Sequence, residues 1–203
     1  MADKCLLEDG HKIVFLGDSI TEAPNGYVSI VERMISTLAP DIRVTCINAG
    51  VGGNQVMDML ERIGDDVIMQ DPDWICISVG INDVWYGLNG TSLEHFIDKY
   101  LELLNTLQSQ TVAKLALFTT TVIGEDLKSE ANHRLMEYND YIRQVAKKRK
   151  MLLVPMNEAF YNAISRWRKT GEIDNKFTTD GVHMTEEGNY LMAVTLLKAW
   201  NVL

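Results

Sequence analysis

The chain has 203 residues, 46% of them hydrophobic and 23% charged, which favours one globular domain spanning residues 1–203. Its 28 acidic and 19 basic side chains give a formal net charge of −9 at pH 7, which repels nucleic acid and anionic membranes and argues against both as partners. No apolar run reaches the roughly 20 residues of a membrane span, and the start, MADKCLLEDGHK, lacks a signal peptide's basic and apolar regions, so we expect a cytoplasmic protein.

Short apolar runs alternate with amphipathic segments along the chain. The runs cover residues 13–16, 42–47, 74–79, 115–119 and 151–154, and their near-continuous apolar character predicts strands buried on both faces. Segments with helical period cover residues 27–38, 56–67, 93–107, 135–145, 160–167 and 190–197. This order predicts a three-layer α/β/α fold with a central parallel sheet of about five strands. Ligands bind beyond the carboxyl ends of such strands, so the residues after each strand are the candidates for function.

The sequence Gly17-Asp18-Ser19-Ile20-Thr21 follows the first predicted strand. It places Ser19 between a strand end and a helix, where a nucleophile would be accessible. A serine in this position often only caps the helix, and the GxSxG elbow of another large serine hydrolase class is absent. Ser19 is therefore a candidate nucleophile that needs support from the rest of the chain.

Two further strand ends carry groups that can donate hydrogen bonds to an anion. The glycine-rich turn Asn48-Ala49-Gly50-Val51-Gly52-Gly53-Asn54 lets the backbone approach a ligand, and its spacing matches neither common nucleotide-binding motif. Gly80-Ile81-Asn82-Asp83 follows the third strand, and the neutral amide of Asn82 can stabilise a developing negative charge. An Asn-Asp pair is also a common turn signal, so each feature is weak alone.

Asp180 and His183 lie three residues apart near the carboxyl terminus, ahead of a helix that Thr185 can cap. This spacing lets the carboxylate accept the Nδ1 proton of the imidazole, which leaves Nε2 facing a serine. An Asp/His metal pair is possible, but the chain offers no third and fourth ligand at a recognisable spacing, so we expect no metal. The three cysteines, Cys5, Cys46 and Cys76, are expected to be free thiols.

Taken together, these blocks resemble the SGNH hydrolases, also called the GDSL family, from Ile13 to Leu197. The resemblance implies a flavodoxin-like fold, a nucleophile at Ser19, and Asp180 and His183 as its partners in a catalytic triad. It also implies an oxyanion hole made of the amides of Ser19 and Gly53 and the side chain of Asn82, and a reaction that needs no metal and no organic cofactor. The first block reads GDSI where the name-giving pattern has leucine, a change that keeps an apolar contact.

The segment from Asn82 to Tyr86 is similar to that of bacterial carbohydrate acetylesterases, and no long apolar insertion provides a lid for lipids. We therefore expect hydrolysis of short-chain carboxylic esters through an acyl-enzyme, with O-acetyl groups on a carbohydrate as the expected substrate. Asp18, Trp85 and Tyr86 are candidates for substrate contacts, although the two aromatic rings could instead pack under the loop that leads to Thr91. A lipase or thioesterase, an acyltransferase and a non-catalytic carbohydrate-binding module remain as alternatives, and a homo-oligomer stays open.

Overall fold

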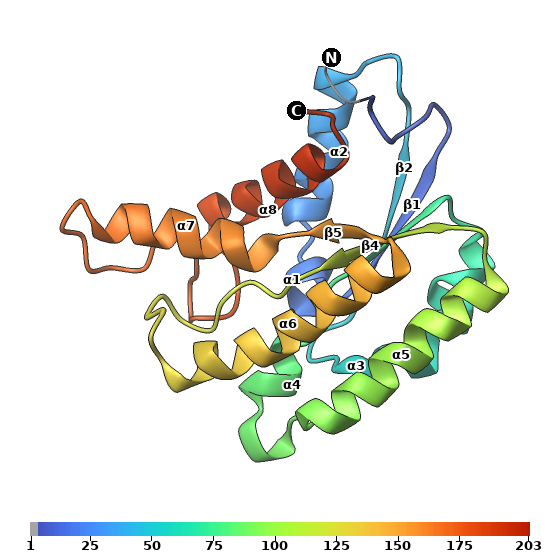
Figure 1. Ribbon diagram of the computed structural model, residues 1–203. Coiled ribbons are helices and arrows are strands. Elements are labelled where there is room, and N and C mark those ends of the chain that lie inside the picture. Colours follow the sequence, from blue (N-terminus) through green and yellow to red (C-terminus); the bar gives the residue numbers. More distant parts are fainter. Residues whose placement is uncertain (1–3) are drawn as a thin grey trace.

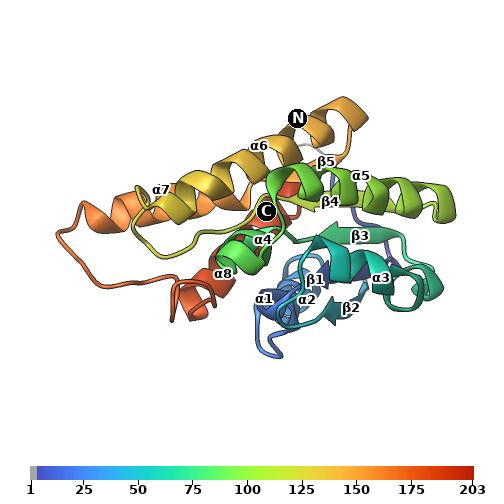
Figure 2. The same cartoon turned by 90° about the horizontal axis from the view of Figure 1, so that it is seen from below.

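The computed structural model describes residues 4–203 and has at its centre a sheet of five parallel strands. The spatial order is β2-β1-β3-β4-β5, which Figure 2 shows with the strands side by side. This is the flavodoxin-like order of doubly wound folds. The strands are β1 (Lys12–Gly17), β2 (Thr45–Gly50), β3 (Trp74–Ile77), β4 (Lys114–Phe118) and β5 (Leu152–Val154).

Helices cover both faces of the sheet, which confirms the predicted three-layer α/β/α fold (Figure 1). On one face α2 packs against α8, and α7 lies beside α8; on the other face α3 packs against α5, and α5 against α6. The helices are α1 (Ser19–Glu22), α2 (Tyr27–Leu38), α3 (Val56–Asp66), α4 (Ile81–Trp85), α5 (Leu93–Gln110), α6 (Glu130–Arg149), α7 (Met156–Arg168) and α8 (Glu186–Ala199), with 3₁₀ turns η1 (Ile68–Gln70) and η2 (Gly87–Asn89).

The core forms where the apolar runs of the central strands meet the apolar stripes of the helices. Strand β1 is buried from Ile13 to Gly17, and all of β3 is buried, because both have neighbouring strands on either side and helices on both faces. The ring of Phe15 meets Tyr27 of α2 edge-on, with 5.9 Å between ring centroids. No helix within residues 4–203 is both long and apolar enough to cross a bilayer.

The second strand differs from its prediction. The apolar run predicted residues 42–47, whereas β2 extends from Thr45 to Gly50 and pairs with β1 through the register Lys12↔Thr45 to Gly17↔Gly50. Since β2 is an edge strand and only partly buried, its residues need not be apolar, and the polar Asn48 belongs to the ladder. The glycine-rich turn therefore begins at Val51, three residues later than predicted. Strand β3 ends at Ile77, two residues before the predicted end.

Candidate active site

Ser19 is the first residue of α1, directly after the carboxyl end of β1. Asp18 caps this helix: its Oδ1 accepts a hydrogen bond from the amide of Ile20 at 2.9 Å. The first amides of a helix have no partner within the helix, so the N–H of Ser19 can serve a ligand. The sequence thus places both the hydroxyl and the amide of Ser19 at the edge of the sheet where ligands bind.

A chain of two hydrogen bonds links Ser19 to the loop before α8. His183 Nε2 lies 2.9 Å from Ser19 Oγ, and His183 Nδ1 lies 2.6 Å from Asp180 Oδ2. The other carboxylate oxygen of Asp180 accepts the amides of Val182, at 3.0 Å, and of His183, at 2.8 Å. With Nδ1 donating to Asp180, Nε2 is left free to accept the proton of Ser19. This is the nucleophile, base and orienting-acid arrangement of acyl-transfer enzymes.

The histidine and the aspartate belong to one hairpin-like loop. An isolated antiparallel bridge joins Thr178 to Met184, and the amide of Thr179 donates to the carbonyl of His183 at 2.9 Å. Gly181 turns the loop with a φ of +97°, a conformation that side chains other than glycine rarely adopt. The loop holds the side chains of Asp180 and His183 at its tip, where both are about half exposed.

Hydrogen bonds to Asp180 lower its pKa well below the usual range. The bond to the side chain of His183 is the largest cause, and the backbone amides of His183 and Val182 act in the same direction. The carboxylate therefore stays ionised at every pH at which the protein is expected to work. A permanent negative charge on Asp180 stabilises the imidazolium that forms when His183 takes up a proton.

Asn82 and the glycine-rich turn lie next to each other, and the turn approaches Ser19, because a Cβ built on Gly52 would be 3.8 Å from the Cβ of Ser19. The Nδ2 of Asn82 donates to the backbone carbonyl of Asn54 at 3.1 Å, which ties α4 to the glycine-rich turn. Because an amide nitrogen carries two protons, one remains for an oxyanion. Gly53 has a φ of +81°, which keeps the turn in a conformation that presents its backbone closely to a ligand.

Arg62 of α3 anchors this half of the site and was not identified from the sequence. Its guanidinium donates to Asn54 Oδ1 at 2.6 Å and to the carbonyls of Ala49 at 2.8 Å and Gly17 at 2.9 Å. It thereby ties the ends of β1 and β2 to the turn that holds Gly53. Only 17% of the Arg62 side chain is exposed. The one feature of the sequence that could have indicated its burial is its position next to Ile63, which lies in the apolar stripe of the helix.

Asp18, which directly precedes Ser19, and the nearby Asp83 are two buried carboxyl groups, with exposed fractions of 1% and 0%. Burial raises the pKa of Asp18 to about 7, and the neighbouring Asp83 adds to this shift. Burial likewise raises the pKa of Asp83 to about 6. Asp18 was a candidate for substrate contact, but its side chain is enclosed and caps α1. This placement favours a role in shaping the nucleophile turn.

Replacing Asp18 by asparagine is expected to stabilise the fold, and more so at high pH. The folded-state pKa of about 7 lies above the ordinary value of 3.8 for an aspartate. The ionised carboxylate therefore destabilises the fold from about pH 4 upward, and the full cost is reached above about pH 7. Asparagine retains the side-chain oxygen that accepts the amide of Ile20 at the helix cap, and it carries no charge. Between pH 5 and pH 8 the gain should widen by about 1–3 kcal/mol, roughly 2–12 °C in Tm, measured by thermal unfolding. An equal gain at both pH values would contradict the burial of a titrating Asp18.

Trp85 and Tyr86 lie at the end of α4 with exposed fractions of 48% and 40%. They therefore do not pack under the following loop, which was the structural alternative for these rings. The hydroxyl of Tyr86 lies over the glycine-rich turn, because a Cβ built on Gly53 would be 2.9 Å from it. Tyr86 thus borders the turn that contains Gly53, and Trp85 is its exposed neighbour at the end of α4.

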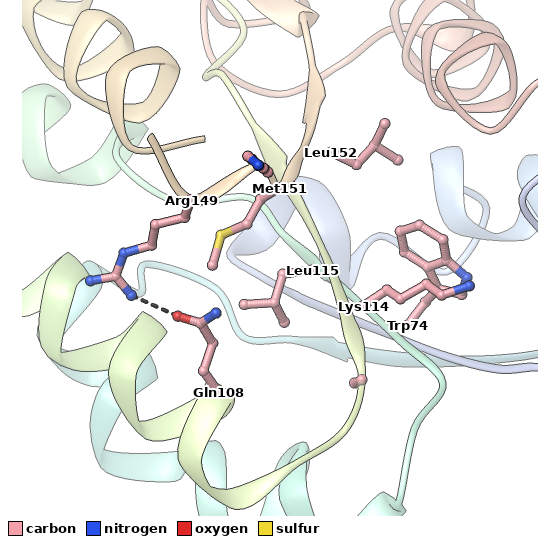
Figure 3. Close-up of a pocket in the computed structure, with 9 residues that line it drawn as sticks. Trp74, Gln108, Lys114, Leu115, Arg149, Met151 and Leu152 are labelled. Atoms are coloured by element: carbon pink, nitrogen blue, oxygen red, sulfur yellow. Dashed lines mark hydrogen bonds between the residues drawn. The ribbon is translucent and has the colours of Figure 1, made fainter. Parts of the chain in front are cut away.

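The opposite edge of the sheet holds a separate cavity of about 540 Å³ (Figure 3). It is lined by the amino-terminal ends of β3, β4 and β5 and by the last turns of α5 and α6, where Arg149 donates to Gln108 at 2.7 Å. Lys114, Arg149 and Lys150 make the lining basic, and the lining contains no serine, histidine or carboxylate. The cavity therefore lacks the side chains that acyl transfer needs, and these lie instead at the edge of the sheet that carries Ser19.

Comparisons with known proteins agree with this geometry. Residues 15–191 match the model of the GDSL-like lipase/acylhydrolase family. An acetylxylan esterase from Geobacillus stearothermophilus is 28% identical over an alignment of 209 positions, gaps included, that covers 93% of this chain and 93% of that protein.

Solved structures give the same picture. The acetylxylan esterase Axe2 from Geobacillus stearothermophilus has a TM-score of 0.85 at 25% identity, over 96% of both chains. LAE5, an alpha/beta hydrolase from the metagenome of Lake Arreo, has a TM-score of 0.88 at 25% identity, over 98% of this chain and 99% of that one. Three further Axe2 structures carry catalytic mutations that replace a serine, an aspartate or a histidine by alanine. The match over residues 15–191 means that this chain belongs to the GDSL-like lipase/acylhydrolase family and is a carboxylic ester hydrolase.

Proposed function

We propose that this protein removes short acyl groups, acetyl above all, from carbohydrate esters by a serine mechanism. The observation that carries the proposal is the hydrogen-bond chain from Ser19 Oγ through His183 to Asp180. The similarity to an acetylxylan esterase over 93% of the chain supports the choice of substrate. Exposed aromatic rings beside the oxyanion turn also support it, since such rings stack on sugars and border small acyl pockets.

In this mechanism Ser19 Oγ attacks the ester carbonyl while His183 Nε2 takes its proton. The carbonyl oxygen becomes an oxyanion that accepts hydrogen bonds from the amides of Ser19 and Gly53 and from the side chain of Asn82. His183 then passes the proton to the leaving alcohol, and the acyl group stays on Ser19 as an ester. Water attacks this acyl-enzyme with His183 again as base, which releases the acid and restores the serine.

The architecture around the oxyanion turn supports a small acyl group. Gln55 donates from Nε2 to the carbonyl of Asn89 at 3.2 Å and accepts from the hydroxyl of Thr91 at 2.7 Å, which ties the turn to the loop after α4. Tyr138 OH donates to the carbonyl of Thr91 at 2.6 Å and fixes that loop from α6. The loop that follows Trp85 and Tyr86 is thus held against the turn, and we infer that this limits the room for a long acyl chain.

The test is a substrate panel of p-nitrophenyl esters from acetate to palmitate, with acetylated xylose and acetylated xylooligosaccharides. We expect kcat/KM to be highest for acetate among the activated esters and acetyl groups to be released from the oligosaccharides. A preference for medium or long acyl chains would overturn the proposed substrate but would leave the assignment as an ester hydrolase intact. Transfer of the acyl group to an added alcohol in place of water would identify an acyltransferase.

Trp85→Ala in the same panel is expected to raise KM for the acetylated oligosaccharide about 10-fold, more than for p-nitrophenyl acetate. The reason is that an aromatic contact contributes about 0.5–1.5 kcal/mol beyond the area it buries. Leu88→Ala is the matched control, because Leu88 is a fully exposed apolar side chain of the following turn. An equal change for both substrates would place Trp85 outside the sugar-binding surface.

A further inference from the structure

Glu125 is a buried carboxylate that the mechanism above does not use. It lies in the loop between β4 and α6, and only 3% of the residue is exposed. Within residues 4–203 no basic side chain forms an ion pair with it. A buried carboxylate without a countercharge is costly unless hydrogen bonds satisfy its oxygens. The groups that donate hydrogen bonds to Glu125 therefore indicate its role.

The partners of Glu125 are backbone amides of the segment that leads into the Asp180–His183 loop. Oε1 accepts the amides of Phe177 at 2.6 Å, Thr178 at 2.9 Å and Lys176 at 3.0 Å, and the amide of Lys176 is also 3.0 Å from Oε2. The hydroxyl of Thr178 adds a bond to Oε1 at 3.3 Å. One side chain thus satisfies three consecutive amides, as an anion does in a backbone nest.

The loop that carries Glu125 is itself fixed to the body of the protein. Asn132, a buried residue in the first turn of α6, accepts the amide of Ile123 at 3.0 Å and donates to the carbonyl of Ile123 at 2.9 Å. Gly124 then touches the catalytic loop directly, because its amide donates to the carbonyl of Gly181 at 2.6 Å. In Figure 1 the yellow loop before α6 runs beside the orange-red loop before α8.

The segment held by Glu125 forms the structural base of the loop that carries Asp180 and His183. Thr178 makes the bridge to Met184, and Phe177 accepts the amide of Thr185 at 3.0 Å. Asp180 and His183 lie between these points with about half of each side chain exposed. Side-chain packing therefore contributes little to their position, which depends on the backbone of the loop and on what holds its base.

We propose that Glu125 is a positioning residue of the active site: its carboxylate fixes the base of the loop so that Asp180 and His183 stay aligned with Ser19. The inference rests on the proposed function, because it concerns the same triad. Glu125 touches neither a substrate nor a reacting atom in this assignment. Its removal misplaces the histidine, and a displacement of about 1 Å in such an arrangement costs on the order of 10²-fold in rate.

We call the hydrogen bonds from the Lys176–Thr178 segment to the Glu125 carboxylate the Glu125 clamp, and two substitutions test it. Glu125→Ala removes every acceptor, and we expect kcat to fall about 10- to 100-fold with KM nearly unchanged, equally for p-nitrophenyl acetate and for an acetylated xylooligosaccharide. Glu125→Gln retains Oε1 as an acceptor but presents an NH₂ group to Lys176, so it should recover part of the activity. Asp126→Asn is the matched control, since this exposed neighbour loses the same charge and its side chain, within residues 4–203, accepts a hydrogen bond only from the amide of Lys128.

A proton NMR measurement separates positioning from general destabilisation. The 2.6 Å bond between His183 Nδ1 and Asp180 should give a far-downfield proton resonance in the wild type and in Asp126→Asn. We expect this resonance to weaken or shift in Glu125→Ala while far-UV circular dichroism stays native, and to return partly in Glu125→Gln. If the alanine variant fails to fold, the kinetics and resonance of the glutamine variant decide the question.

The outcomes are distinguishable. Wild-type kcat and an unchanged resonance in the Glu125 variants, with Ser19→Ala inactive, would overturn the clamp and leave the proposed function intact. A KM effect confined to the oligosaccharide would also overturn it, because Glu125 would then act on the substrate. If Ser19→Ala were as active as the wild type, the proposed function would fail, and the clamp with it.

Discussion

Replacing Ser19 by alanine is expected to lower kcat for p-nitrophenyl acetate by about 10⁵- to 10⁶-fold, the loss found when the nucleophile of a serine hydrolase is removed. In the proposed mechanism the hydroxyl that His183 Nε2 contacts at 2.9 Å forms the acyl-enzyme, so no other group of the site can replace it. A residual rate above that in water would come from the oxyanion donors. Initial rates at saturating substrate measure this loss.

The matched control is Ser29→Ala, because Ser29 is a partly buried serine of the neighbouring helix whose hydroxyl bonds only to the carbonyl of Gly26, at 3.0 Å. Quenched reactions of the wild type should carry one acetyl group on the peptide that contains Ser19, and the alanine variant should carry none. Turnover by Ser19→Ala at more than a few per cent of the wild-type rate would rule out the serine mechanism.

Replacing Asp180 by asparagine is expected to lower kcat at neutral pH by about 10⁴-fold while the fold and KM change little. The carboxylate accepts the Nδ1 proton at 2.6 Å, and its depressed pKa keeps it charged. An asparagine that presents its NH₂ group to Nδ1 places the imidazole proton on Nε2, and Nε2 then cannot accept the proton of Ser19. The loss is therefore in chemistry, and kcat from full saturation curves measures it.

Asp174→Asn provides the comparison for this variant. Asp174 is an exposed aspartate of the segment before the catalytic loop, and its backbone carbonyl accepts hydrogen bonds from neighbouring side chains. Its substitution should leave kcat within about twofold of the wild type, as for surface positions generally. Equal losses in the two variants would show that net charge near the loop, and not the bond to His183, accounts for the effect.

The sequence predicted the architecture well because its signals are local. Apolar runs such as Ile13–Leu16 and helical stripes such as that of Tyr27–Leu38 arise from neighbouring residues, and a buried parallel sheet requires such continuous runs. The blocks around Ser19, Asn82 and His183 could be located for a related reason, since each follows a strand or precedes a helix. The limits of β2 could not be predicted, because its polar residues belong to the strand only through pairing with β1.

The anchors of the site could not be predicted because their partners are distant in the chain. Arg62 reaches the carbonyl of Gly17 across 45 positions, and Glu125 reaches the amide of Thr178 across 53. No local pattern distinguishes such a residue from an ordinary surface charge. The exposure of Trp85 and the burial of Asp18 have the same origin, because they depend on which elements pack around these side chains.

The amino-acid pattern alone predicts the order of strands and helices, the parallel sheet and the residue types that chemistry at its edge would need. Folding brings Ser19 and His183, 164 positions apart, within hydrogen-bond distance, and it selects the buried groups that hold them there. This division arises because strand and helix patterns depend on short-range periodicity, whereas hydrogen-bond geometry at a site depends on how distant elements pack. The candidate acid, base and nucleophile can therefore be located in the sequence, and their alignment is a property of the folded chain.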